Sequence, residues 1–177
     1  MAIIFKLFLT LNSLCLVFAI FLVNNKVDVI EKLFPSIKLP HIFAYTSYFV
    51  ISIFFTWVSI YIAKSLGDDQ ISSGSITEVE PANDTYLPVY LGYFFVALSI
   101  NDFQIFFFIF TIIFLFSFLS LTVYFNPLYL CFRYKFYYAK TDKNIKIFII
   151  SKKIMRNPLE VEFTKIKRIN DYTFMDV

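Results

Sequence analysis

Four long apolar runs occupy most of the first 127 residues, and they constrain the fold more than any other feature of the sequence. A helix needs about 17–25 apolar residues to cross the roughly 30 Å hydrocarbon core of a bilayer, because each residue adds about 1.5 Å. Hydrophobic residues make up 59% of the chain, against roughly 45–50% in a typical soluble domain. The chain is therefore predicted to be an integral membrane protein. The runs cover 7–23, 42–63, 87–100 and 103–125.

The residues that flank these runs set the predicted helix ends. The first run is extended to residue 3 if Lys6 reaches the membrane surface, and no small-x-small cleavage pattern follows it, so a retained helix is favoured over a signal peptide. The third run is short; Tyr86 extends it, and Pro88 suits a first helical turn. Asn101 and Asp102 predict a tight turn before the fourth run. Four transmembrane helices are predicted near 3–23, 42–63, 86–100 and 103–125.

Basic residues are concentrated at the other end of the chain. The last 50 residues carry 11 of the 16 lysines and arginines. Lys and Arg near membrane spans collect on the cytoplasmic side, and an even number of helices puts both termini on one side. We predict a multi-pass inner (cytoplasmic) membrane protein with both termini in the cytoplasm. On this topology Lys6, Lys64, Arg133, Lys135 and Lys140 lie inside, whereas Lys26, Lys32 and Lys38 lie outside.

The loop 67–85 differs in kind from the rest of the membrane part, 1–127. It contains no basic residue, and the stretch 72–75 of serines and a glycine indicates flexible backbone. Beside a basic tail, such a loop predicts an electrostatic contact between the two. Its acidic residues are Asp68, Asp69, Glu78, Glu80 and Asp84.

The tail 128–177 is predicted to be a small β-rich cytoplasmic module. Segments 134–141 and 145–151 flank a polar turn and suit a β-hairpin. A second pair, 159–169 and 172–175, follows the break at Asn157-Pro158. Fifty residues are few for an independent core, so the tail is expected to dock on the membrane helices, on a neighbouring subunit, or on both.

No pattern of catalytic residues is present in the sequence. It contains no glycine-rich phosphate loop and no nucleophile elbow, and Cys15, Cys131 and His41 do not build a zinc site. A non-enzymatic protein without cofactor or metal is predicted. Small polar residues within the spans, among them Asn12, Thr56 and Ser59, favour helix packing. A pore lined by some of them is the alternative, although no charged residue lies deep in a span.

The basic tail has three functional interpretations beside plain solvation. It can anchor to anionic lipid, dock an acidic protein, or contact nucleic acid. Direct nucleic-acid binding is not expected, because alternate residues of a strand face opposite sides and break a continuous patch. The candidate docking residues are Arg133, Lys135, Lys152, Lys153, Arg156, Lys165, Lys167 and Arg168, together with Asp68, Asp69, Glu78 and Glu80.

Three segments carry a resemblance to a known family. They are 76–81 (ITEVEP) leading to 86–92 (YLPVYLG), 125–128 (FNPL), and 149–153 (IISKK) with 168–172 (RINDY). In the order of its elements the chain resembles the KwaA family, the membrane subunit of the bacterial Kiwa anti-phage system. The resemblance implies a four-helix inner-membrane protein that forms a homotetramer, senses infection at the envelope, and holds a cytosolic DNA-binding effector, KwaB. It carries over no catalytic residue.

Two functions of different class follow. The first is a sensor and scaffold, in which a change of helix packing moves the tail that holds the effector. The short third helix is the candidate moving part, because mismatch with the bilayer has an energetic cost. The alternative is an oligomeric pore that depolarises the host.

Overall fold

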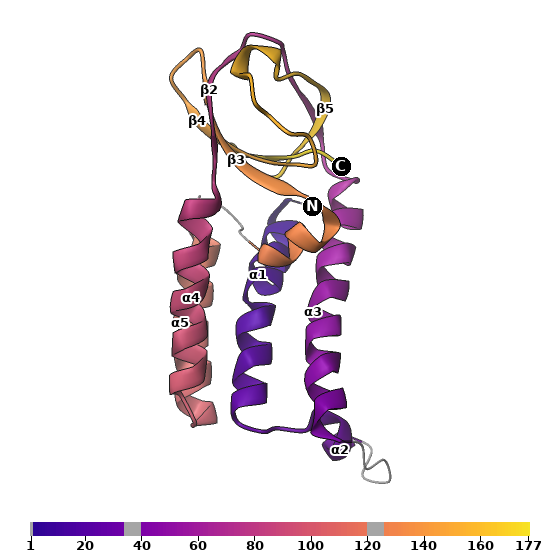
Figure 1. Cartoon of the computed structure of the whole chain (residues 1–177), viewed down its shortest axis with the longest axis vertical. Coiled ribbons are helices and arrows are strands. Elements are labelled where there is room, and N and C mark those ends of the chain that lie inside the picture. Colours follow the sequence, from indigo (N-terminus) through magenta and orange to yellow (C-terminus); the bar gives the residue numbers. More distant parts are fainter. Residues whose placement is uncertain (1, 34–39, 120–125) are drawn as a thin grey trace.

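The computed structural model describes residues 2–33, 40–119 and 126–177, and within this part a bundle of long helices carries a β-sheet at one end (Figure 1). Helix α1 (Ala2–Asn24) lies in the middle and contacts each of the other three long helices. The termini lie at the end of the bundle that carries the sheet, and the short helix α2 (Val29–Leu33) lies at the opposite end. The other long helices are α3 (His41–Ala63), α4 (Asn83–Ser99) and α5 (Phe103–Leu119).

Two of these helices are long and apolar enough to cross a membrane. They are α1, over Ile3–Asn24, and α3, over His41–Ala63. The apolar part of α4, Leu87–Ser99, and the whole of α5 are shorter. The 17 residues of α5 span about 25 Å, less than the roughly 30 Å of hydrocarbon. The predicted end of the fourth helix, 120–125, lies outside the described residues, so a four-span topology stays a prediction.

The bundle core is built around the middle helix. Leu14, Val17 and Phe21 of α1 are buried, and Phe21 stacks on Phe106 of α5 with 3.7 Å between ring centroids. Ala97 of α4 is also buried in this cluster. Small residues at such contacts let membrane helices approach closely. The core thus forms where α3, α4 and α5 each pack one face against α1.

The turn between α4 and α5 agrees with the sequence, but the start of α4 does not. Asp102 accepts hydrogen bonds from the backbone N–H groups of Gln104 and Ile105 (2.8 and 2.9 Å) and so caps α5. However, α4 begins at Asn83 and not at 86, which leaves Pro88 inside the helix. The prediction that Pro88 occupies the first turn was therefore wrong. The first turn of a helix tolerates proline best, because proline lacks a backbone N–H. Here the helix begins about one turn before the predicted start, so Pro88 lies beyond the first turn.

In the described part of the chain, the sheet has six strands in the order β1-β5-β6-β4-β3-β2. The two predicted hairpins are confirmed as pairings, because β3 pairs antiparallel with β4 and β5 with β6. The predicted strand 159–169 begins only at Phe163, since Pro158–Glu160 form a 3-10 helix. A parallel pairing of β4 with β6 joins the two hairpins. The strands are β1 (Asp68–Ile71), β2 (Ile76–Pro81), β3 (Lys135–Thr141), β4 (Lys146–Ser151), β5 (Phe163–Arg168) and β6 (Thr173–Met175).

The acidic segment is not a flexible loop, and that interpretation was wrong. Its residues form β1 and β2, the two edge strands of the sheet, paired antiparallel with β5 and β3. Ile71 and Ile76 are buried in a hydrophobic cluster of sheet residues. Gly74, at φ +79°, makes the turn between β1 and β2. The tail 128–177 therefore supplies four of the six strands, and the membrane part supplies the other two. β1 and β2 pair with backbone groups of β5 and β3 that the other tail strands leave unpaired. Unpaired groups on a strand edge promote association with other chains, which is the physical reason for this arrangement.

Candidate functional site

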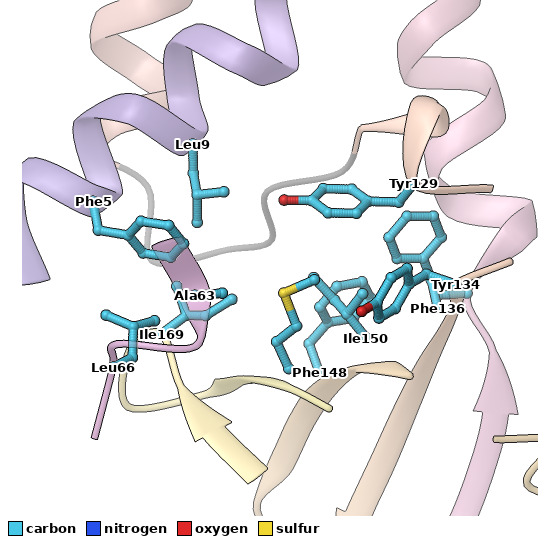
Figure 2. Close-up of a cluster of buried hydrophobic side chains, with 12 residues drawn as sticks. Phe5, Leu9, Ala63, Leu66, Tyr129, Tyr134, Phe136, Phe148, Ile150 and Ile169 are labelled. Carbon is cyan, nitrogen blue, oxygen red and sulfur yellow. The ribbon is translucent and has the colours of Figure 1, made fainter. Parts of the chain in front are cut away.

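The candidate site is the junction where the helical bundle meets the sheet. A cluster of buried apolar side chains fills this junction, and we call it the junction cluster (Figure 2). Because it joins residues of α1 and α3 to residues of the sheet, the expected docking of the tail on the helices is confirmed. Its members are Phe5, Leu9, Ala63, Leu66, Ala82, Tyr129, Tyr134, Phe136, Phe148, Ile150, Ile169 and Met175.

A 3-10 helix, η1 (Pro127–Phe132), connects the bundle to the first strand of the tail and contacts α3. Asn126 caps it by accepting a hydrogen bond from the backbone N–H of Leu128 (3.0 Å), and Pro127 occupies its first turn. Arg133 ends it in the left-handed conformation at φ +64°. The Asn126-Pro127 pair, which follows the predicted end of the fourth helix at 125, thus begins the element that enters the junction.

Buried polar side chains link η1 to α1 and α3, and we call Asn12, Thr56, Ser59, Asn126 and Tyr129 the polar network. The Asn126 amide donates to the Thr56 hydroxyl (3.0 Å) and to the Asn12 carbonyl oxygen (3.3 Å). The Asn12 amide lies 3.5 Å from the Ser59 hydroxyl, which it faces as a donor. All five side chains are buried. Such groups stabilise one packing of the helices, because any rearrangement leaves them unpaired in a medium of low dielectric constant.

Tyr129 belongs to both the polar network and the junction cluster. Its hydroxyl lies 2.6 Å from the Ser59 hydroxyl, and either group can be the donor of this bond. Its ring meets Tyr134 and Phe136 edge-on, with centroids 6.0 and 6.3 Å apart. Burial raises the pKa of Tyr129, and the bond to Ser59 offsets only part of that rise. The hydroxyl therefore stays protonated at neutral pH, and its role is to hold η1 to α3 by a hydrogen bond, not to act as an acid or base.

Sequence reasoning found only part of this site. Asn12, Thr56 and Ser59 were among the small polar residues expected to serve helix packing, and their hydrogen bonds confirm that role. Asn126 and Tyr129 were missed as members. The Asn-Pro capping signal was visible, but nothing local indicates that the same asparagine also reaches across to α1 and α3.

The predicted contact between the acidic segment and the basic tail is confirmed. Lys167 forms an ion pair with Asp68 (2.7 Å) and also donates to the carbonyl oxygen of Leu66 (2.9 Å), just after α3. The hydrogen bond from Lys167 lowers the pKa of Asp68, which stays ionised. The further pairs across these strands are Glu78 with Lys140 (3.4 Å) and Asp69 with Arg168 (4.0 Å).

These pairs divide the predicted docking residues. Lys167, Arg168, Asp68, Asp69 and Glu78 are engaged within the chain, on the two edges of the sheet. The other docking candidates lie in separate places. Arg133, Lys135 and Lys152 lie at the end of the sheet that faces the bundle, Lys153 and Arg156 lie on the connection between β4 and β5, and Glu80 and Lys165 are exposed on β2 and β5.

The connection 152–162 carries an exposed apolar surface. Ile154 is 61% exposed and Leu159 is 63% exposed. A shallow pocket of about 340 Å³, lined by residues that include Ile154, Arg156 and Phe163, opens beside them. Lys153 is held there, with its amine 3.2 Å from the carbonyl oxygen of Glu162 and over the ring of Phe163. This connection therefore offers both apolar and basic groups at the surface.

The far end of the bundle holds a contact that the sequence did not indicate. His41 Nδ1 lies 3.4 Å from the carboxylate of Asp28, which also accepts a hydrogen bond from the N–H of Glu31 (2.9 Å). Tyr48 donates to the carbonyl oxygen of Val27 (2.7 Å). These bonds tie α2 to α3. Within the described ranges, no three His, Cys, Asp or Glu side chains are grouped so that they could hold a metal ion.

The family model of the anti-phage protein KwaA matches residues 5–175, which is nearly the whole chain. The chain belongs to the anti-phage KwaA family. A role in antiviral defence follows from this membership. No curated protein and no solved structure matches the chain.

Proposed function

We propose that the protein is the membrane-embedded sensor and scaffold of an anti-phage defence complex, which detects infection at the inner membrane and holds a cytosolic DNA-binding effector. Membership of the anti-phage KwaA family supports the defence role. The observation that carries the sensor role is Tyr129, which bonds Ser59 inside the bundle and packs on Phe136 of β3. A shift of α3 therefore changes the position of the sheet through a buried contact.

The proposed topology has four spanning helices with the sheet and both termini in the cytoplasm. Lys6 and Lys64 lie at the sheet end of the bundle, whereas Lys26 and Lys32 lie at the other end. This distribution, together with the basic sheet, supports the orientation through the positive-inside rule. The short helices α4 and α5 are then the spans most sensitive to bilayer thickness.

The proposed sensing step is a switch between two packings of the helices. A stimulus that alters the bilayer acts first on the α4–α5 pair, which contacts α1. Movement of α1 would disturb the bonds that join Asn12 to Thr56 and to Asn126, and so favour the second packing. The sheet then changes its position relative to the membrane. This mechanism requires no catalytic residue, and we propose a non-enzymatic role in a homotetramer.

The proposed effector contact is the connection 152–162, where Ile154, Leu159 and Arg156 are exposed. The exposed apolar side chains offer area that a partner can bury, and arginine is enriched among the residues that contribute most to binding. The paired charges at the sheet edges are less suited, because a partner must first displace Asp68 from Lys167 or Glu78 from Lys140.

Affinity purification of the intact protein from native membranes, with mass spectrometry of the proteins that accompany it, tests this proposal. We expect a stoichiometric cytosolic partner that is lost when Ile154→Ser is combined with Leu159→Ser. The matched control combines Ile145→Ser with Tyr172→Ser, since both side chains are exposed in other turns of the sheet. A partner-free oligomer that conducts ions in liposomes would contradict the scaffold and support the pore instead.

A further inference from the structure

Exposed basic side chains gather where the sheet meets the bundle. Lys64 directly follows α3, and Arg133 directly follows η1, which bonds to α3 through Tyr129. Lys135 begins β3 and pairs in register with Ser151, which places it beside Lys152. All four are exposed, and we call Lys64, Arg133, Lys135 and Lys152 the basic collar.

The collar differs from the basic residues of the sheet edges in having no acidic partner. Lys140, Lys167 and Arg168 form ion pairs within the chain. Among the described residues, none of the four collar residues forms an ion pair with Asp or Glu. The nearest carboxylate by sequence and pairing, Asp176, accepts a hydrogen bond from the Ser151 hydroxyl (2.6 Å). The collar therefore carries four positive charges that form no ion pair with a carboxylate in the described part of the chain.

The fold holds the backbone of Arg133 and the side chain of Lys152 in position. The αL conformation of Arg133 at φ +64° is set by the end of η1, whose backbone N–H bonds the carbonyl oxygen of Leu130 (2.9 Å). The amine of Lys152 lies over the ring of Tyr134, 4.7 Å from its centroid. Cation–π contacts of this kind fix the direction of a long side chain. The positive charges thus have a defined place relative to the bundle.

Aromatic residues mark the level of the membrane surface just before the collar. Trp57 and Tyr61 of α3 stack on each other and are 52% and 67% exposed. Trp and Tyr are enriched where the hydrocarbon meets the head groups. Lys64 lies one turn beyond Tyr61, about 4.5 Å further along the axis. The collar therefore lies at the level of the lipid phosphates if α3 spans the bilayer.

We infer that the basic collar binds the phosphate head groups of anionic phospholipids in the leaflet on the sheet side, and so fixes the height and tilt of the sheet above the membrane. The inference rests on the membrane topology of the proposed function, and it assigns to the protein a preference among lipids. The choice of lipid follows from charge complementarity, because four exposed positive groups without an ion-pair partner lie where the sheet meets the bundle, next to the expected level of the phosphates.

The test compares two charge-matched triple variants of the full chain in nanodiscs. The collar variant carries R133Q, K135Q and K152Q, and the control carries K143Q, K146Q and K165Q, all exposed lysines further from the bundle. Each set loses three positive charges and one cation–π contact, Lys152 over Tyr134 or Lys146 over Tyr138. Spin-labelled phosphatidylglycerol and phosphatidylcholine report the relative association of each lipid with the protein.

We expect the wild type and the control to prefer phosphatidylglycerol over phosphatidylcholine. In the collar variant, this preference should fall by about fivefold for each replaced residue that contacts a head group. The preference should also weaken at high salt. Equal lipid preference in the two variants would overturn the inference while leaving the scaffold function untouched, since effector co-purification is measured separately. Failure of the wild type to enter nanodiscs would instead refute the membrane topology on which both proposals rest.

Discussion

Replacement of Asn126 by alanine tests the polar network most directly. The side chain caps η1 through Leu128 N–H and donates to Thr56 and Asn12. A lost cap lowers the free energy of unfolding by about 1 kcal/mol. Each lost side-chain bond between membrane helices lowers it by about 0.6 kcal/mol on average. The sum is a destabilisation of about 2 kcal/mol.

A second asparagine in the chain provides the control. Asn157 precedes Pro158 and caps the 3-10 helix η2 (Pro158–Glu160) by accepting from Leu159 N–H (3.3 Å), as Asn126 does for η1. However, Asn157 is exposed, and its amide donates only to the exposed Glu160 (2.7 Å). Asn157→Ala therefore removes a cap without disturbing the bundle, and we expect a loss of about 1 kcal/mol or less.

Thermal unfolding of the detergent-solubilised variants measures the difference. For a protein of this size 1 kcal/mol corresponds to roughly 2–4 °C in Tm. We expect Asn126→Ala to lower Tm by about 4–8 °C, and Asn157→Ala by no more than about half of that. Protection against phage should fall for Asn126→Ala at equal amounts of protein in the membrane. Equal Tm values for the two variants would refute the reasoning that Asn126 holds η1 to α1 and α3.

The remaining predictions concern single parts of the same architecture. Tyr129→Phe keeps the ring contact but loses the bond to Ser59; we expect reduced phage protection with normal effector co-purification, and loss of the effector would contradict a purely transmitting role. Lys167 lowers the pKa of Asp68, so this ion pair stabilises the fold fully above pH 3.8, and the stabilisation is lost as the pH falls through the lowered pKa. Asp68→Asn should therefore make Tm depend less on pH on the acid side of the curve. Identical curves would show that the pair contributes nothing measurable. Lengthening α4 by one apolar turn should alter phage protection, because mismatch with the bilayer changes, and unchanged protection would exclude α4 as the moving part.

The proposed site was predictable only where its signals are local. Thr56 and Ser59 were recognised as packing residues, because small polar side chains within an apolar run have few other roles. Tyr129 gave no such signal, since its neighbours in sequence are apolar and its partners lie in α3 and β3. The acidic segment was misinterpreted for a related reason. Its serines and carboxylates suggested a solvated loop, and the strand character of Ile71 and Ile76 becomes evident only beside β5 and β3.

The sequence by itself determined the features that depend on neighbouring residues. Long apolar runs form helices because a backbone in an apolar medium must bond within its own segment, and the polar turns between β3 and β4 and between β5 and β6 close hairpins. Tertiary structure alone decided which distant segments meet. It set β1 and β2 on opposite edges of the sheet and joined β4 to β6 in parallel. It also brought Asn126 to Asn12, 114 positions away. Such pairings satisfy hydrogen-bonding groups that are far apart in the sequence, and no local sequence pattern predicts which distant residue will be the partner.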